Sequence, residues 1–310
     1  MQTASQMPTH EPVLTDEVVG FLHPQGGGVF VDCTVGAGGH AQALLEAGAG
    51  RLVGIDRDPH ALSVSRERLA PWAGRVQLVH ADYRALATVL DERGIGEVDG
   101  IVADLGVSSM QLDGEGRGFS FQRDETLDMR MDPGSGPTAA ELIGEASEQD
   151  LADLIFRYGE ERYSRRIARA IVQARAVGPI ATTGQLAAIV RRAVPTRGWQ
   201  RIDPATRTFQ ALRIWVNREL EDLDRFLEVA CGRLRGGAAI VVITFHSLED
   251  RVVKHTLRSI AQRGEAGIRV LTKKPVRPGD AELGRNPRAR SAKLRAAERL
   301  LPPRERDWGT

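Results

Sequence analysis

The 310-residue chain is poor in the features that mark secreted and membrane proteins. Its two cysteines, Cys33 and Cys231, are too few and too far apart for a disulfide framework or a metal site. No apolar run approaches the ~18 residues that a membrane-spanning helix needs. The first eight residues lack the basic start and apolar core of a signal peptide. We therefore expect a cytoplasmic protein that binds neither a membrane nor a metal ion.

Aromatic residues make up only 5% of the chain, and no sign of charge dominates, since the net charge is +1. This balance hides an asymmetry. Residues 269–306 carry twelve Lys and Arg against four Asp and Glu, whereas residues 1–268 carry thirty basic and thirty-six acidic residues. A basic tail on a near-neutral body indicates a polyanionic partner, although a solvated tail without a partner would have the same composition.

Apolar segments alternate with helical patterns in the first hundred residues, which predicts an α/β fold with parallel strands and right-handed crossovers. The expected strands are 29–33, 51–56, 75–80 and 99–104, and the expected helices are 39–47, 59–70 and 84–93. An apolar run at 238–245 predicts a fifth strand. A helix over roughly 248–263 follows it.

The middle of the chain interrupts this alternation. Residues 106–140 are rich in Gly, Asp, Ser and Pro, which predicts a long ordered loop, and residues 138–194 hold helical patterns with no strand between them. One long helix is expected from about Thr206 to Leu234, and the end of the chain is expected to be mostly loop, with one strand near residues 268–272. We therefore predict one domain from residues 1–110 and 205–310, with an all-helical domain inserted at 111–204.

A glycine-rich turn and an acidic residue follow the first two strands. Gly36, Gly38 and Gly39 allow a sharp turn and a close approach of the backbone to a ligand, because no Cβ intervenes. Such a turn could hold a pyrophosphate or the carboxylate of S-adenosylmethionine. Asp56 ends the next strand, where a carboxylate can accept both hydroxyls of an adenosine ribose. Capping of the helix that begins near Pro59 is the structural alternative for Asp56.

Asp104 ends an otherwise apolar strand, at the edge where a parallel sheet binds its ligands. A partly buried carboxylate needs a partner. That partner could be the exocyclic amine of a substrate or the amino group of a cofactor, or Asp104 could cap the turn at residues 106–109. We predict that Asp104 is catalytic.

Two further residues follow strands of the predicted sheet. Tyr83 lies just past the third strand, where it could pack on an adenine ring or simply join the core. His246 follows the fifth strand and could contact a base or a phosphate, so we predict it as the second catalytic residue. In the alternative reading this segment is a helix cap, formed by Ser247 with Asp250.

Longer motifs are more specific than the glycine turn. They are Asp32–His40 (DCTVGAGGH), Asp104–Ser109 (DLGVSS), Gly116–Asp132 (GRGFSFQRDETLDMRMD) and Ile243–Arg251 (ITFHSLEDR). With these motifs, and over nearly its whole length, the chain resembles the MraW-type family of bacterial small-subunit (16S) ribosomal RNA cytosine-N4-methyltransferases.

This resemblance implies a class I S-adenosylmethionine-dependent methyltransferase fold with a Rossmann-like sheet and a helical insertion. It implies S-adenosylmethionine as the methyl donor and the N4 amine of a cytidine in the decoding region of 16S ribosomal RNA as the acceptor. The small ribosomal subunit would be the partner, and an exposed insertion could support a homodimer. The cofactor contacts of the family fall on Gly38, Gly39, His40, Asp56, Tyr83, Asp104 and Gln111.

One departure from a common pattern concerns the target base. Many other amino-methyltransferases end the fourth strand with an acid or Ser, two prolines and an aromatic residue, but here the segment reads Asp-Leu-Gly-Val. Another group must therefore hold the cytosine.

Two alternative functions fit parts of the sequence. A nicotinamide-dependent oxidoreductase would use the region from Gly36 to Asp56, although the turn lacks the G-x-G-x-x-G spacing. A non-catalytic ribosome-assembly factor would keep the fold and an RNA-binding surface.

Overall fold

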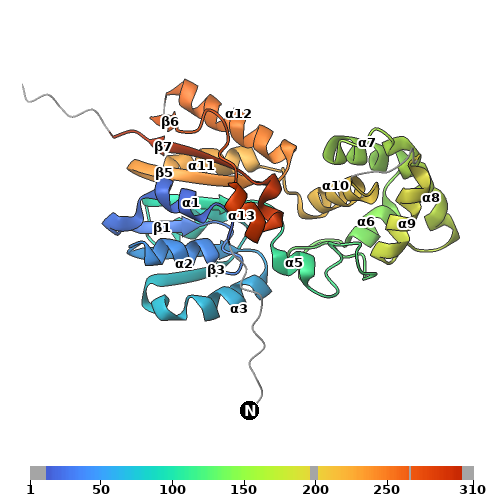
Figure 1. Cartoon of the computed structure of the whole chain (residues 1–310), viewed down its shortest axis with the longest axis horizontal. Helices are drawn as coiled ribbons and strands as arrows, with labels where there is room; N and C mark the ends of the chain where they lie inside the picture. The colour runs from blue at the N-terminus through green and yellow to red at the C-terminus, as the bar shows by residue number, and fades with distance from the viewer. Residues whose placement is uncertain (1–11, 196–201, 265–266, 302–310) are drawn as a thin grey trace, which may run out of the picture. The chain divides into compact units, whose positions relative to one another are not determined.

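The computed structural model describes residues 12–195, 202–264 and 267–301 (Figure 1). The chain forms two compact units, the first from residues 1–106 and 222–310 and the second from residues 107–221. Within the described ranges, no helix is both long enough and apolar enough to cross a membrane. The expectation about a signal peptide concerns residues 1–8, which lie outside these ranges.

A seven-stranded sheet forms the centre of the first unit, in the order β3-β2-β1-β4-β5-β7-β6. The strands are β1 (Val29–Asp32), β2 (Arg51–Asp56), β3 (Val76–His80), β4 (Val98–Asp104), β5 (Leu234–Thr244), β6 (Ile268–Val270) and β7 (Lys293–Arg299). Strands β1 to β5 are parallel, and β7 runs antiparallel between β5 and β6. The carboxyl ends of β1, β2 and β4 therefore meet at one edge of the sheet, on either side of the point where the strand order reverses.

Helices cover this sheet in two groups (Figure 1). They are α1 (Thr15–Leu22), α2 (Gly39–Glu46) and α3 (Pro59–Arg68) in one group, and α4 (Leu86–Asp91), α11 (Leu223–Arg233) and α12 (Ser247–Arg263) in the other. Helix α1 packs beside α2, and α11 packs beside both α4 and α12. The sheet order with its antiparallel β7 is that of the class I methyltransferase fold, as the resemblance predicted.

The prediction of one long helix at 206–234 was wrong. The structure has two helices, α10 (Ala205–Asn217) and α11, and Arg218 and Asp222 between them have φ angles of 53° and 52°. Such left-handed backbone cannot continue a right-handed helix. Both helices have apolar residues at helical spacing, so in sequence they resemble one continuous helix. In the structure α10 buries its apolar side in the second unit, and α11 buries its own in the first.

The prediction of a loop-rich basic tail was also wrong in part, because β7 lies inside the sheet. Arg295 of β7 is buried and its Nε lies 2.6 Å from Asp250 Oδ1 of α12. Arg299 pairs with Glu97 at 3.0 Å. Arg295 and Arg299 thus form ion pairs within the first unit. The exposed cations of the described tail concentrate in the connection from β6 to β7, at Lys273, Lys274, Arg277, Arg285, Arg288 and Arg290.

The second unit is helical and has its own core. Its helices are α5 (Ser109–Asp113), α6 (Ala139–Glu145), α7 (Glu148–Gly159), α8 (Ser164–Val177), α9 (Thr183–Ala193) and α10. Helix α7 packs against both α8 and α10. The second unit extends beyond the predicted insertion, 111–204, because Phe209 and Leu212 of α10 are buried in its core.

The loop that precedes α6 is held in place by α10. The side-chain oxygen of Asn217 accepts a hydrogen bond from Met131 N at 2.8 Å, and its side-chain nitrogen donates to Met129 O at 2.7 Å. Met129 is buried and has a φ angle of 64°. The ordered loop predicted at residues 106–140 thus depends on Asn217, which lies 86 positions after Met131 in the chain.

Candidate active site

The glycine turn lies between β1 and α2, as predicted. Gly36 and Gly38 have φ angles of 52° and 81°, in the left-handed region that glycine adopts without strain. A Cβ on Gly39 would lie 2.9 Å from Cγ of Pro12, so no larger residue fits there without a shift. No side chain of the described residues caps the amino end of α2. Its first-turn N–H groups are therefore suited to bind a carboxylate.

Asp56, at the end of β2, is held against this turn. Its Oδ2 accepts a hydrogen bond from Gly36 N at 2.7 Å, and its Oδ1 accepts one from Asp58 N at 2.9 Å. Burial raises the pKa of Asp56, although the two backbone donors act in the opposite direction. The capping alternative does not hold, because Asp58 is the residue that caps α3, through His60 N at 3.0 Å. Each carboxylate oxygen of Asp56 retains an acceptor position for a hydroxyl group.

Asp104 and His40 come together at the ends of β4 and β1. Asp104 Oδ2 lies 3.6 Å from His40 Nε2, and the backbone N of Asp104 donates to Thr34 Oγ1 at 2.7 Å. His40 is almost fully buried. Burial by itself lowers the pKa of His40, but the carboxylates of Asp104, Asp32 and Glu282 outweigh it, so the net change is upward. The sequence had pointed to His40 only through the resemblance.

Asp32 is a third member of this cluster, and no sequence prediction named it. It ends β1, is 1% exposed, and its pKa is raised to about 7, mainly by burial. Its Oδ1 accepts a hydrogen bond from Thr34 N at 3.2 Å. The signal that identified Asp56 and Asp104, an acid at the end of an apolar strand, was equally present for Asp32.

Buried polar atoms without a partner mark this cluster as a ligand site. Within the part of the chain that the structure describes, six buried side-chain nitrogen and oxygen atoms lack a hydrogen bond, and four of them belong here. They are Asp32 Oδ2, Asp104 Oδ1 and both ring nitrogens of His40. Buried polar groups are rarely left unpaired, because their desolvation is costly. Two carboxylate acceptors beside an uncapped helix end fit an amino acid moiety, whose ammonium and carboxylate groups need these partners.

Tyr83 begins a 3-10 helix after β3, at Tyr83–Ala85. Its ring packs edge-on against Phe226 of α11, with 4.7 Å between centroids, and it is partly exposed. Burial raises the pKa of its hydroxyl group. Tyr83 therefore contacts the core on one side, and its contact with adenine stays a prediction.

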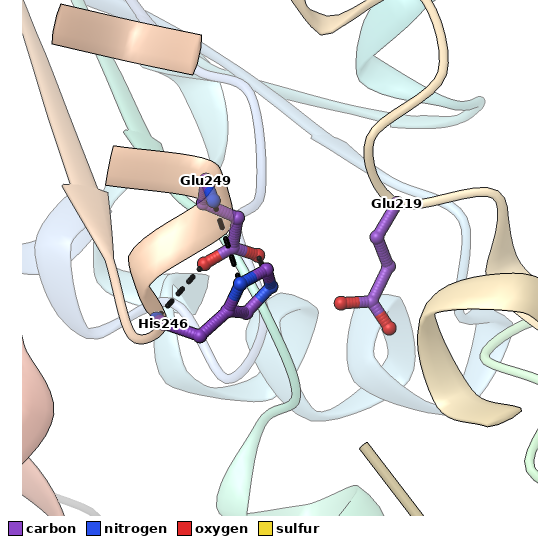
Figure 2. Close-up of side chains that lie close together, drawn as sticks. All are labelled: Glu219, His246 and Glu249. Carbon is purple, nitrogen blue, oxygen red and sulfur yellow. Dashed lines mark hydrogen bonds and ion pairs between the residues drawn. The ribbon is translucent and has the colours of Figure 1, made fainter. Parts of the chain in front are cut away.

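His246 has a local role that we had expected of its neighbours. It is the N-cap of α12, since its Nδ1 accepts from Glu249 N at 3.4 Å, and its Nε2 lies 3.0 Å from Glu249 Oε1. Figure 2 shows the His246 ring facing the Glu249 carboxylate. The capping box therefore consists of His246 and Glu249, and not of Ser247 and Asp250. Its predicted catalytic role stays a prediction.

Gln111 lies in the second unit, in the first turn of α5. Its side-chain oxygen accepts a hydrogen bond from Ser108 N at 3.1 Å and thereby closes a capping box with Ser108. The other predicted cofactor residues, namely Gly38, Gly39, His40, Asp56, Tyr83 and Asp104, all belong to the first unit.

Comparison with known proteins identifies the relatives of this fold and site. The sequence model of the MraW methylase family matches residues 7–300. The chain belongs to the MraW methylase family. A protein of Geotalea uraniireducens named ribosomal RNA small subunit methyltransferase H is 50% identical over 307 residues, which cover 94% of this chain and 98% of that protein. A protein of the same name from Nitratidesulfovibrio vulgaris is 53% identical, over 94% of this chain and 86% of that protein.

Among solved structures, an rRNA methylase from Streptococcus thermophilus aligns with a TM-score of 0.41 and 11% identity, over 92% of this chain and 93% of that one. As an MraW methylase, the chain is a methyltransferase with S-adenosylmethionine as its methyl donor. The oxidoreductase alternative has no support from these relatives, and neither has the non-catalytic one.

Proposed function

We propose that this MraW methylase transfers a methyl group from S-adenosylmethionine to the N4 amine of a cytidine in the decoding region of 16S ribosomal RNA. The Asp32–His40–Asp104 cluster carries the proposal, because its unpaired acceptors lie next to the glycine turn and to Asp56. The relatives at about 50% identity, each named for methylation of small-subunit ribosomal RNA, support the substrate. We propose that the protein acts in the cytoplasm, where ribosomal subunits are found, and a homodimer stays a prediction.

The residues of the first unit divide the binding of the donor. The amino end of α2, at Gly38, Gly39 and His40, receives the carboxylate of the methionine moiety. Asp32 and Asp104 face its ammonium group. Asp56 receives the ribose hydroxyls, and Tyr83 contacts the adenine. S-adenosylmethionine supplies an electrophilic methyl group on a sulfonium sulfur.

Asp104 has the second task of orienting the target amine. The lone pair of a cytosine amine is delocalised into the ring, so the amine is a weak nucleophile. A carboxylate oxygen that accepts one of its N–H bonds directs the nitrogen toward the methyl group, and such alignment supplies several kcal/mol. Proton loss is easier after methyl transfer, so a strong base is not required beforehand. We propose that His246 fixes the turn after β5 beside this centre.

The second unit presents a basic helix face suited to RNA. Arg165, Arg166 and Arg169 of α8 are exposed, and their spacing places them on one side of the helix. Of these three arginines, Arg169 alone has an ion pair with a described residue, the exposed Glu148, at 3.4 Å. Residues 162–175 contain five arginines and no acidic residue. We propose that this face contacts phosphates, which fixes the orientation of the RNA without reading its sequence.

Incubation of small ribosomal subunits with labelled S-adenosylmethionine tests the proposal. We expect N4-methylcytidine in the nucleoside digest with the wild-type protein and none with Asp104→Asn, which keeps the shape of the side chain. Absence of methylated cytidine from subunits at every stage of assembly would contradict the proposed substrate. Calorimetric binding of S-adenosylmethionine without any methylation would point to the assembly-factor alternative.

A further inference from the structure

The end of β4 lacks an aromatic residue for the target base. After Asp104 the chain continues with Leu105, which is buried, and with Gly106, which has no side chain. Enzymes that modify a base inside a folded nucleic acid extrude it, and a flat side chain usually receives the extruded base. Another element must therefore supply this surface.

The register of the sheet places Phe245 beside this segment. Asp104 pairs with Ile243 of β5, and the next residue, Leu105, donates its N–H to Ile243 O at 2.9 Å, so the pairing continues past the end of β4. Two residues beyond Asp104 and Ile243, the same register brings Gly106 level with Phe245. A Cβ on Gly106 would lie 3.4 Å from Cδ2 of Phe245. The ring edge thus lies against the backbone of Gly106 with no side chain between them.

Gly106 has a φ angle of 110°, which other residues adopt only with strain. The backbone conformation at residue 106 therefore favours glycine, so no side chain lies between this residue and Phe245. Because Asp104 lies two residues before Gly106, its carboxylate and the Phe245 ring belong to neighbouring strand ends at the same edge of the sheet.

The Phe245 side chain packs in part against the hydrophobic core of the first unit, and its backbone is fixed. Phe245 is partly exposed, although the residues on both sides of it, Thr244 and His246, are buried. Its N–H donates to Glu249 Oε2 at 3.0 Å, and Glu249 is 1% exposed. The Glu249 carboxylate that faces His246 in Figure 2 therefore also anchors Phe245. Among the described residues, no aromatic ring pairs with Phe245, so its remaining exposed surface is not taken up by an aromatic partner.

We infer that Phe245 is the residue on which the target cytosine stacks, while Asp104 at the neighbouring strand end accepts the amine hydrogen bond. This inference rests on the proposed function and adds the group that holds the base. In this protein the aromatic residue follows the fifth strand instead of the fourth, and Gly106 has no side chain that would occupy its place. Stacking on a side chain is insensitive to the identity of the base, so Phe245 contributes affinity and orientation, and Asp104 contributes recognition of the amine.

Replacement of Phe245 by Leu and by Tyr tests the inference. Loss of one stacking contact is expected to lower kcat/KM for small subunits about ten- to hundredfold in Phe245→Leu, and Phe245→Tyr should restore most of it. Calorimetry should give both variants the wild-type Kd for S-adenosylmethionine. A fluorescent cytidine analogue at the target position of the RNA should be quenched by the wild-type protein and by Phe245→Tyr, but not by Phe245→Leu.

The outcomes separate this inference from the function on which it rests. Wild-type kcat/KM in Phe245→Leu, or a weakened Kd for S-adenosylmethionine, would overturn the role of the ring. Failure of the wild-type protein to methylate any subunit would overturn the proposed function instead, whereas the quenching assay would still report on stacking. If Phe245→Leu does not fold, Phe245→Met keeps an unbranched apolar side chain without an aromatic face and replaces it in every measurement.

Discussion

Four acidic residues of the first unit look alike in sequence, but their surroundings give them different properties. Asp58 caps a helix, Asp56 is bound by two backbone N–H groups, Asp104 faces His40, and Asp32 is enclosed. Burial raises the pKa of Asp32 to about 7. A buried carboxylate of this kind lowers stability when it is charged, which a functional site can tolerate and a purely structural position would avoid.

Asp32→Asn should therefore stabilise the protein in a pH-dependent way. The carboxyl group has a pKa of about 3.9 in the unfolded chain and about 7 in the folded one. Between these values the folded state holds a proton that the unfolded state has lost, so the stability of the wild-type protein falls as the pH rises from about 4 to 7. Asn carries no such proton and keeps the oxygen that accepts from Thr34. We expect a gain of about 2–4 kcal/mol above pH 7 and little difference near pH 4.

Urea unfolding of both proteins without S-adenosylmethionine, at pH 5 and pH 8, measures this difference. If the stability difference between Asp32→Asn and the wild-type protein is the same at pH 5 and pH 8, Asp32 is not the titrating group.

Asp56→Ala should weaken binding of S-adenosylmethionine about ten- to hundredfold, because it removes a charged acceptor for the ribose and the anchor of Gly36. Asp58→Ala is the matched control, since it removes an acid two residues away that caps α3. The control should lower the melting temperature, with a loss of about 1 kcal/mol, and leave the Kd unchanged. Calorimetry and thermal unfolding of both variants measure the two effects. Equal Kd values in the two variants would remove the ribose role.

At the scale of elements, β7 shows why the basic charge of a segment does not by itself identify a binding surface. β7 pairs with β5 over six residues and with β6 over three, and its Arg295 is buried against α12. Removal of the chain after residue 268 would delete this strand from the interior of the sheet. We expect such a truncation to unfold the first unit, so the deletion cannot isolate the contribution of the tail to RNA binding.

Charge reversal in the connection from β6 to β7 avoids this difficulty. Lys273→Glu, Lys274→Glu and Arg277→Glu together change three exposed cations. If each contacts one phosphate, the slope of log affinity for small subunits against log salt should decrease in magnitude by about 2–3. Lys293→Gln is the control, because Lys293 pairs with Asp250 inside the first unit. An unchanged slope in the triple variant would show that this connection does not contact phosphates.

At the scale of the whole molecule, the chain builds two cores. The second unit buries its own apolar residues from Phe119 to Leu212. Helix α10 contributes four of them, and its Asn217 binds the loop before α6. A contiguous segment with a complete core should fold alone.

We therefore expect residues 107–221 to form a folded fragment. Residues 111–204, the boundaries that the sequence suggested, lack α10 and should not unfold cooperatively. Circular dichroism melts of the two fragments compare them directly. Cooperative melting of the shorter fragment would show that α10 is not needed for the core of the second unit.

The sequence by itself determined the positions of β1 to β5 along the chain, the glycine turn, the placement of Asp56 and Asp104 at strand ends, and the family. Each of these follows from a local pattern: an apolar run of strand length, a polar residue at its end, or a contiguous motif. The break at residues 218–222, the place of β7 in the sheet and the meeting of Asp32 with His40 were decided by the tertiary structure. The contact of Phe245 with Gly106 joins positions 139 residues apart, and only the pairing of β4 with β5 brings them together, because no local pattern encodes a register between distant strands.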